Sequence, residues 1–492
     1  MVMSALQELS LAVLNGPPEE QALEYEKRWY TWGELGQVAR DVVTLIQESG
    51  APANSKIALV AKNRPSAVAA YLGLMGEGLS FRMVYPFQSS VAMATELASI
   101  KPSVMVAAAE TYDATLIAAL QDMGVAAIAL REKSAIFVPG LERSTIEPAV
   151  SNTPIIEIHT SGTTGTPKPF EFDYDTVARH IVGGRATPSS VGADPKNLPP
   201  VLMYFPAGNI TGLHSTIAPL LRGLRGMLLD RFSVEGWHDH LVRYRPSAGG
   251  LPPAGVQMIL DADLPPEDFR SLKMIGSGSA PLDPTVQKRF EERYKVPILL
   301  AYGATEFGGP VASMTPEVYQ TWGDQKVGSV GKPFPGVKLR VIDPNNFTEL
   351  SAGAVGLLEV VSPRMGEHWI RTADLAYLDE DGFLFLCGRA DGAIMRGGFK
   401  ILPETIEKAL LQHPAVAAAG VVGVADHRLG QVPAAAIQAK AGQPSPSVEE
   451  LESHLRERVA ATHIPVKWTF VEALPRTASY KVHQPALREL FE

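Results

Sequence analysis

One short loop constrains this chain more than any other feature. Residues 155–159 form a mostly apolar run typical of a strand, and residues 160–168 follow with the sequence Thr-Ser-Gly-Thr-Thr-Gly-Thr-Pro-Lys. Glycines let a backbone approach a ligand closely, while free N–H groups, hydroxyls and a lysine can bind phosphate oxygens. The loop does not fit a Walker A motif, and a polar surface turn is the alternative interpretation. The candidate phosphate-binding residues are Thr160, Ser161, Gly162, Thr163, Thr164, Gly165 and Lys168.

The residues before this loop alternate between helix-like and strand-like segments. Residues 32–49 are amphipathic and follow Thr31, a suitable N-cap. Residues 66–77 also have a helical pattern, whereas residues 56–61 and 104–109 are short apolar runs. Repeated β-α units of this kind predict a parallel sheet covered by helices.

The character of the sequence changes twice in its second half. Glycine, proline and short β runs dominate residues 328–388, which predicts a small β-rich subdomain. Helix-like and strand-like segments then follow as an α+β unit of about 100 residues. We therefore expect an α/β protein with a large N-terminal domain of layered subdomains, residues 1–387, and a small C-terminal domain, residues 388–492.

Composition limits the possible partners. The chain has 492 residues, of which 46% are hydrophobic and 20% charged, and its formal net charge is −9. This balance is that of a globular protein, and the negative charge argues against nucleic acid and anionic membranes as partners. No apolar run is long enough for a transmembrane helix. The lone Cys387 excludes an internal disulfide, suits the cytoplasm, and is expected to be a buried strand residue.

The glycine- and threonine-rich loop resembles the phosphate loop of the adenylate-forming superfamily. That superfamily includes acyl- and aryl-CoA synthetases, adenylation domains of peptide synthetases and firefly luciferase. Residues 301–306 resemble its Y-G-x-T-E motif. The resemblance implies that Tyr302 stacks on adenine, Thr305 bonds a phosphate, and Glu306 binds Mg²⁺ as a hard oxygen ligand.

Further motifs follow in the order and spacing of the family, over nearly the whole chain. Residues 370–375 resemble R-T-G-D with alanine in place of the glycine, and Asp374 would accept hydrogen bonds from both ribose hydroxyls. Arg389 would contact the ribose or the α-phosphate. Residues 276–282 resemble the segment that passes along adenine and substrate. The remaining nucleotide-binding candidates are Gly278, Ser279, Ala280 and Gly303.

The C-terminal part resembles the mobile domain of the family. Residues 388–392 resemble its hinge motif, with Gly392 in place of the second acid, and Asp391 would be the residue about which the domain swings between an adenylating and a thiol-transferring pose. Residues 474–481 resemble the motif of the catalytic lysine. Lys481 would neutralise charge where the carboxylate meets the α-phosphate, and Tyr480 stands where most relatives have glycine.

Two further segments resemble substrate channels. Residues 396–400 resemble the loop that lets the pantetheine arm pass, although a simple turn is an alternative; its candidates are Gly397, Gly398, Phe399 and Lys400.

In residues 204–212, Gly208 and Asn209 replace an aromatic residue and a histidine that often gate the acid pocket, which suggests a roomier or more polar mouth. The other candidates for the pocket wall are His214, Gly249, Gly250 and Leu251. A helix histidine with satisfied hydrogen bonds is an equally good interpretation of His214.

The resemblance implies ATP-dependent activation of a small carboxylic acid to an acyl-adenylate, with release of pyrophosphate, and transfer of the acyl group to the thiol of coenzyme A. ATP, Mg²⁺ and coenzyme A would be the cofactors. Alternatives with the same fold are an enzyme that loads the phosphopantetheine of an acyl carrier protein, one that stops at the adenylate, and a luciferase-like oxygenase. An alternative of another class is a non-catalytic acyl- or nucleotide-binding protein, against which Lys168, Glu306, Asp374 and Lys481 argue.

Overall fold

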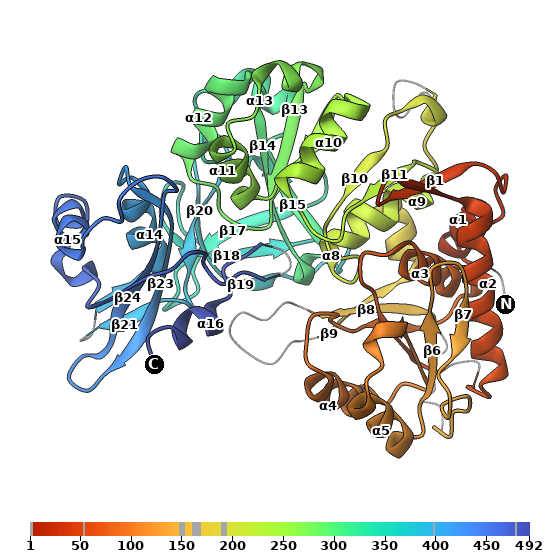
Figure 1. The fold of residues 1–492 in the computed structure, drawn as a ribbon. Coiled ribbons are helices and arrows are strands. Elements are labelled where there is room, and N and C mark those ends of the chain that lie inside the picture. The colour runs from red at the N-terminus through yellow and green to blue at the C-terminus, as the bar shows by residue number, and fades with distance from the viewer. Residues whose placement is uncertain are drawn as a thin grey trace.

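The computed structural model forms layered α/β units, and its described residues contain five β-sheets (Figure 1). The N-terminal part, red to green, holds three of the sheets, the cyan segment the fourth and the blue C-terminal part the fifth. The described ranges are 3–52, 55–146, 153–159, 169–187, 194–396, 399–477 and 480–492, without the side chains of Phe399 and Lys400. None of the helices in these ranges combines the length and apolar character needed to cross a membrane.

The first sheet has seven strands in the order β7-β6-β5-β3-β4-β8-β9. Its five central strands are parallel and the two edge strands antiparallel. The strands are β3 (Ile57–Val60), β4 (Phe81–Met83), β5 (Val104–Ala108), β6 (Ala126–Leu130), β7 (Ala135–Phe137), β8 (Ile155–His159) and β9 (Pro169–Asp173). The parallel sheet expected from the β-α alternation is therefore present.

Helices cover both faces of this sheet. Ile57 and Leu59 of β3 share a core with α1, α2 and α3, whereas Ala58 and Val60 point to a second core with α4 and α5. Because both faces are covered, the central strands are apolar throughout rather than alternating. The helices are α1 (Ala5–Leu14), α2 (Trp32–Glu48), α3 (Pro65–Glu77), α4 (Ser90–Ile100) and α5 (Ala114–Met123). Thr31 caps α2 as predicted and forms a capping box with Glu34.

Two more sheets complete the α/β part. One has the order β10-β11-β1-β2 and the other β12-β13-β14-β15-β16, in which β12, β13 and β14 are parallel. Their strands are β1 (Gln21–Tyr25), β2 (Arg28–Thr31), β10 (Val201–Met203), β11 (Gly226–Leu228), β12 (Ala248–Gly250), β13 (Met274–Gly278), β14 (Ile298–Ala304), β15 (Gly309–Ser313) and β16 (Lys332–Pro333). The helices are α6 (Tyr174–Thr176), α8 (Ile210–Gly212), α9 (Ala218–Leu221), α10 (Val234–Tyr244), α11 (Pro253–Asp261), α12 (Pro284–Tyr294) and α13 (Pro316–Trp322).

The β-rich segment is an antiparallel sheet of four strands paired in chain order. Its strands are β17 (Lys338–Ile342), β18 (Gly356–Val361), β19 (Ile370–Leu378) and β20 (Leu384–Arg389). Cys387 lies in β20 as expected, but it is partly exposed and not buried, because its strand is at the edge of the sheet. Burial of part of the side chain still raises the pKa of the Cys387 thiol.

The C-terminal unit is an α+β layer built on the long antiparallel pair β23 and β24. Its elements are β21 (Ile394–Arg396), β22 (Phe399–Ile401), α14 (Pro403–Leu411), β23 (Val416–Asp426), β24 (Gly430–Ala439), α15 (Val448–Arg456), β25 (Lys467–Phe470) and α16 (Gln484–Glu489). Helices α14 and α15 pack on one face of the sheet and α16 on the other. The fold class, a large α/β N-terminal domain with a small C-terminal domain, is confirmed; the boundary at residue 388 stays a prediction.

Candidate active site

Part of the nucleotide candidates, from Gly278 to Ala280 together with Tyr302 and Gly303, lie at the carboxyl ends of parallel strands, where open α/β sheets bind ligands. Strand β13 ends at Gly278 and strand β14 at Ala304. A side chain at Gly278 would put its Cβ 2.7 Å from the carbonyl oxygen of Ala301, so only glycine lets these strands approach closely. Ser279 follows with a φ of 70°, in the left-handed region, and turns the chain sharply at the strand end.

Tyr302 and Asp374 meet across two sheets. The Tyr302 hydroxyl donates to Asp374 Oδ2 at 2.5 Å, and the Nη1 of Arg389 lies 3.2 Å from Asp374 Oδ1. Burial, together with the Asp374 carboxylate, raises the pKa of Tyr302 well above its usual value. The phenol is therefore a protonated donor, and both oxygens of Asp374 are held in place.

Arg389 links Asp374, the candidate for ribose binding, to Asp391, the candidate for the hinge. Arg389 binds Asp391 through two hydrogen bonds, Nε to Oδ1 at 2.9 Å and Nη2 to Oδ2 at 2.6 Å. Its backbone N–H donates to Glu404 Oε1 at 3.2 Å. The hydrogen bonds to Asp391, followed by the charge of Asp374, raise the pKa of Arg389. Residues 374, 389 and 391 are thus one connected polar cluster.

Lys481 reaches this cluster from the C-terminal unit. Its loop is closed by backbone hydrogen bonds, because the Thr477 N–H donates to the Lys481 carbonyl at 2.8 Å and the Tyr480 N–H to the Thr477 carbonyl at 2.9 Å. Burial lowers the pKa of Lys481, while the carboxylates of Glu306 and Asp374 oppose this shift. The lysine is therefore within electrostatic range of both carboxylates.

Glu306 is available as a ligand for a cation. It lies in a short 3₁₀ turn, Thr305–Phe307, that directly follows β14. Within the described ranges, its carboxylate forms no ion pair, and no cluster of three or more metal-ligating side chains occurs. Water and phosphate oxygens are common further ligands of a magnesium ion, and they could complete a site at Glu306.

The acyl-pocket candidates Asn209 and His214 make different hydrogen bonds. Asn209 is the N-cap of α8, since its Oδ1 accepts from the Gly212 N–H at 2.7 Å. His214 lies in the π-helical turn Leu213–Ile217, and its Nε2 is 2.9 Å from the Gly308 carbonyl oxygen. Burial lowers the pKa of His214 to about 4, so the ring is neutral and donates this hydrogen bond. The His214 ring therefore has a satisfied hydrogen bond and holds the loop after Glu306, while its place in the pocket wall stays a prediction.

The glycines of β12 face opposite sides of their strand. A Cβ at Gly249 would lie 3.6 Å from Leu272 and 3.8 Å from Trp237, so this glycine faces the core and not a cleft. A Cβ at Gly250 would lie 3.5 Å from the buried Tyr204 hydroxyl, which has no hydrogen-bond partner among the described residues. Leu251 is fully buried in the same core. Of these three candidates, Gly250 is the one beside an unpaired polar group.

Part of the predicted site lies outside the described residues. This holds for the phosphate loop and for two glycines of the thiol channel. The undescribed candidates are Thr160, Ser161, Gly162, Thr163, Thr164, Gly165, Lys168, Gly397 and Gly398, together with the side chains of Phe399 and Lys400. Their roles stay predictions.

A polar network at the end of β8 was missed by the sequence reasoning. His159, the residue before the phosphate loop, contacts the Arg82 guanidinium, and its Nδ1 is 3.2 Å from Glu96 Oε1. The buried Glu157 carboxylate binds Lys56 at 2.5 Å and Arg82 at 2.7 Å. The signal was present, because two polar side chains interrupt an otherwise apolar strand. This network holds the end of β8 at His159 in place.

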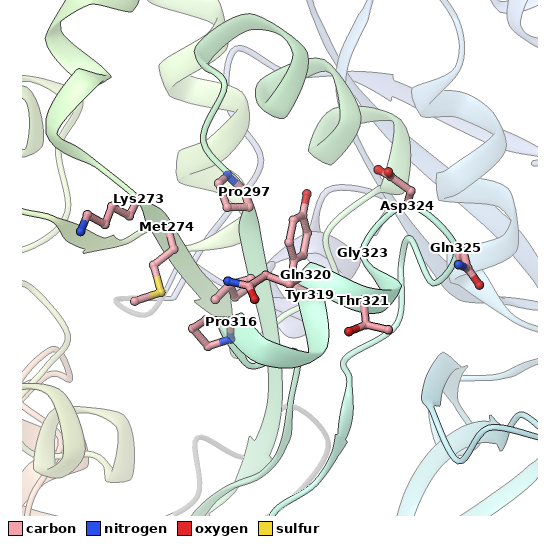
Figure 2. Close-up of a pocket in the computed structure, with 11 residues that line it drawn as sticks. Lys273, Met274, Pro297, Pro316, Tyr319, Gln320, Thr321, Gly323, Asp324 and Gln325 are labelled. Atoms are coloured by element: carbon pink, nitrogen blue, oxygen red, sulfur yellow. The ribbon is translucent and has the colours of Figure 1, made fainter.

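A cavity of about 550 Å³ lies elsewhere in the same sheet region. Figure 2 shows its lining, which includes Lys273, Pro297 and Tyr319. Lys273 and Pro297 immediately precede β13 and β14, so the cavity opens at the amino ends of the strands. It is therefore on the opposite edge from the candidate active site.

The sequence matches known families over most of its length. Residues 12–368 match the AMP-binding enzyme family, and residues 405–481 match the AMP-binding enzyme C-terminal domain. A 2-succinylbenzoate–CoA ligase of Bacillus cereus strain Q1 is 31% identical over 351 residues, which cover 68% of this chain and 70% of the relative. A second such ligase, from Bacillus cereus strain ATCC 14579, is 28% identical and covers 96% of both chains.

Solved structures share the fold. ATP-bound MatB from Rhodopseudomonas palustris superimposes with a TM-score of 0.80 at 21% identity, over 99% of both chains. The o-succinylbenzoate CoA synthetase from Bacillus subtilis, in complex with its acyl-adenylate intermediate, gives a TM-score of 0.77 at 23% identity, over 98% of this chain and 97% of the other.

The fold and the sequence matches define an adenylate-forming enzyme. The chain belongs to the AMP-binding enzyme family. Within it, the chain is an AMP-forming acid–thiol ligase, which activates a carboxylic acid with ATP and transfers the acyl group to coenzyme A.

Proposed function

We propose that this ligase acts on a carboxylic acid that carries a flat ring, with 2-succinylbenzoate as the first compound to test. The curated relatives that cover 96% and 68% of this chain are named for that acid. Gly276, in the middle of β13, supports a flat group, because a Cβ there would meet nothing closer than 3.9 Å and the space beside the strand stays open. The buried Tyr204 hydroxyl beside Gly250 is a free donor for an oxygen of the acid.

The observation that carries the proposed residue roles is that the buried Lys481 lies within electrostatic range of Glu306 and Asp374. In the first step a carboxylate oxygen of the acid attacks the α-phosphorus, the bond to the bridging oxygen breaks, and pyrophosphate leaves. Two anionic groups must approach each other in this step. Lys481 lowers that barrier by placing a preorganised positive charge between them, and a Mg²⁺ ion held by Glu306 would add positive charge beside the phosphates.

The nucleotide is held by the cluster around Asp374. Tyr302 offers its ring to adenine, and Asp374 accepts the ribose hydroxyls with the lone pairs that Tyr302 and Arg389 leave free. In the second step the sulfur of coenzyme A attacks the acyl carbon, and AMP leaves with its phosphate oxygen. A carrier-protein phosphopantetheine would undergo the same chemistry and is the alternative acceptor.

We place the enzyme in the cytoplasm on the evidence of its single cysteine. Two of the three substrates of the proposed reaction, ATP and coenzyme A, are available in that compartment. Expression with a fluorescent fusion partner tests the location directly, and secretion of the fusion would contradict it.

The test of the proposed function is acid-dependent ATP–pyrophosphate exchange. A panel of 2-succinylbenzoate, benzoate, anthranilate, malonate and octanoate would be followed by product mass with and without coenzyme A. We expect exchange with a ring-bearing acid and a coenzyme A thioester as product. Preference for malonate or octanoate would overturn the substrate class, and a thioester formed only with a carrier protein would overturn the acceptor.

Glu306→Gln tests the proposed magnesium ligand in the same assay. Pyrophosphate exchange should fall by about a hundredfold or more, because a neutral amide no longer balances the cation. Glu317→Gln is a matched control, since Glu317 is an exposed glutamate in the nearby helix α13. Normal exchange by Glu306→Gln would remove this residue from the site.

A further inference from the structure

Tyr480, the residue before Lys481, has a backbone conformation that tyrosine rarely adopts. Its φ is 61°, in the left-handed region, where the Cβ of an L-residue is crowded by the backbone. Glycine adopts this conformation without that cost. A bulky residue here therefore persists only if its side chain makes compensating contacts.

Those contacts are made with the N-terminal part of the chain. The Tyr480 hydroxyl donates a hydrogen bond to the backbone carbonyl of Phe232. The two rings pack edge to face, with centroids 5.6 Å apart and an interplanar angle of 90°. Burial raises the pKa of Tyr480 although the charges of Arg231 and Arg476 lower it, so the hydroxyl stays protonated as a donor.

The surface that receives Tyr480 is rigid. Phe232 is 1% exposed and belongs to the core beneath β12, β13 and β14. Its ring also packs against Tyr204, with centroids 5.4 Å apart and an interplanar angle of 69°. The ring that Tyr480 contacts is therefore held in place by the acyl-pocket segment.

Tyr480 is equally well fixed within its own loop. Its N–H donates to the Thr477 carbonyl at 2.9 Å, and its carbonyl accepts from Arg476 Nη1 at 2.9 Å. The next residue, Lys481, donates its N–H to Thr477 Oγ1 at 3.2 Å. A displacement of Tyr480 from Phe232 must therefore also displace Lys481, which shares this hydrogen-bonded loop.

We propose that Tyr480 is a positioning residue, which holds the C-terminal domain in the adenylate-forming pose by binding the Phe232 surface. This inference rests on the two-pose mechanism of the proposed function and adds a residue that biases the two poses. The contacts exist only while the domain is docked with Lys481 in the site. Tyr480 therefore favours adenylation and opposes the swing that precedes transfer to the thiol.

Tyr480→Gly separates this role from a structural one, because glycine keeps the left-handed backbone without strain and loses only the docking contacts. Acid-dependent pyrophosphate exchange should fall by about tenfold, whereas conversion of supplied acyl-adenylate and coenzyme A to the thioester should be unchanged or faster. Tyr480→Phe keeps the ring contact and should lose about threefold in exchange. Tyr319→Phe, which removes a hydroxyl bonded to Glu291 outside the site, should change neither reaction.

Hydrogen exchange gives a second readout that needs no acid substrate. With ATP bound, residues 230–234, 475–477 and 480–483 should be protected in the wild type and less protected in Tyr480→Gly. Equal loss of both half-reactions, or full exchange activity together with unchanged protection, would overturn the inference. Inactivity of the wild type with every acid, with protection lost as expected in Tyr480→Gly, would overturn the proposed substrate class and support the docking role.

Discussion

The hydroxyl of Tyr302 donates a 2.5 Å hydrogen bond to Asp374 Oδ2, and this bond joins the end of β14 to β19 in a different sheet. Asp374 Oδ1 is held separately by Arg389 at 3.2 Å. A carboxylate has about four lone-pair positions. The two protein donors therefore leave room for the ribose hydroxyls and fix the direction from which they can bind.

Tyr302→Phe tests this relationship, because it keeps the ring that is proposed to stack on adenine and removes only the hydroxyl. Loss of one hydrogen bond that orients Asp374 corresponds to about 1 kcal/mol. We expect the KM for ATP to rise about fivefold, with a smaller change in kcat. Tyr377→Phe is the control, since Tyr377 is in the same strand as Asp374 and stacks on Phe385. An unchanged KM would show that Tyr302 does not position Asp374.

Lys481→Ala separates catalysis from binding. The variant loses the charge that approaches Glu306 and Asp374, so adenylation from acid and ATP should fall by about a hundredfold or more. Conversion of synthetic acyl-adenylate and coenzyme A should continue at a near-normal rate, because the thiol-transferring pose moves this loop out of the site. Lys467→Ala is the control, as Lys467 is exposed in the same domain. If both reactions are normal, Lys481 has no catalytic role.

Apolar strands were the most predictable part of the fold. The runs 155–159 and 104–109 contain β8 and β5, because each is bounded by polar residues or proline. The hairpin of β1 and β2 was missed for a specific reason. Its turn residues Glu26 and Lys27 have φ values of 49° and 63°, so the turn lacks the glycine or asparagine that usually marks such a conformation.

The site was predictable where a motif specified it and unpredictable where contacts are long-range. The resemblance of residues 474–481 to a family motif placed Lys481 in the proposed site. The docking of Tyr480 on Phe232 joins residues 248 positions apart, and no local pattern encodes it. The sequence also could not predict that Gly249 faces the core. Its strand has three residues, which is too short for an alternating pattern to show which side of the strand faces the core.

Asp391→Pro tests the proposed hinge. Proline fixes φ near −65° and should obstruct the swing of the C-terminal domain. Adenylation should largely survive, while transfer to coenzyme A should fall about tenfold or more. Asp391→Ala is the matched control, because it removes the two hydrogen bonds to Arg389 and leaves φ free. Equal effects of the two variants would assign the role to the ion pair and not to the hinge.

Glu407 gives the C-terminal unit a specific dependence on pH. The side chain is in α14, and its Oε1 accepts from the Val421 N–H at 2.8 Å. Burial, followed by the nearby charge of Glu404, raises the pKa of Glu407 to about 8, from 4.5 for a free glutamate. Between these pH values the folded protein carries a proton that the unfolded chain has lost. The contribution of protonated Glu407 to the free energy of unfolding is complete below pH 4.5 and is lost as the pH rises through about 8.

Glu407→Gln should remove this dependence, because the amide is neutral at every pH and its oxygen can still accept from Val421. The free energy of unfolding of the wild type should decrease relative to Glu407→Gln by up to about 1.4 kcal/mol per pH unit between pH 5.5 and 7.5. Urea unfolding followed by the fluorescence of Trp468, the tryptophan of this unit, measures the difference. Glu449→Gln, at an exposed position in α15, should run parallel to the wild type. A constant difference between wild type and Glu407→Gln across this range would mean that Glu407 is already ionised in the folded protein.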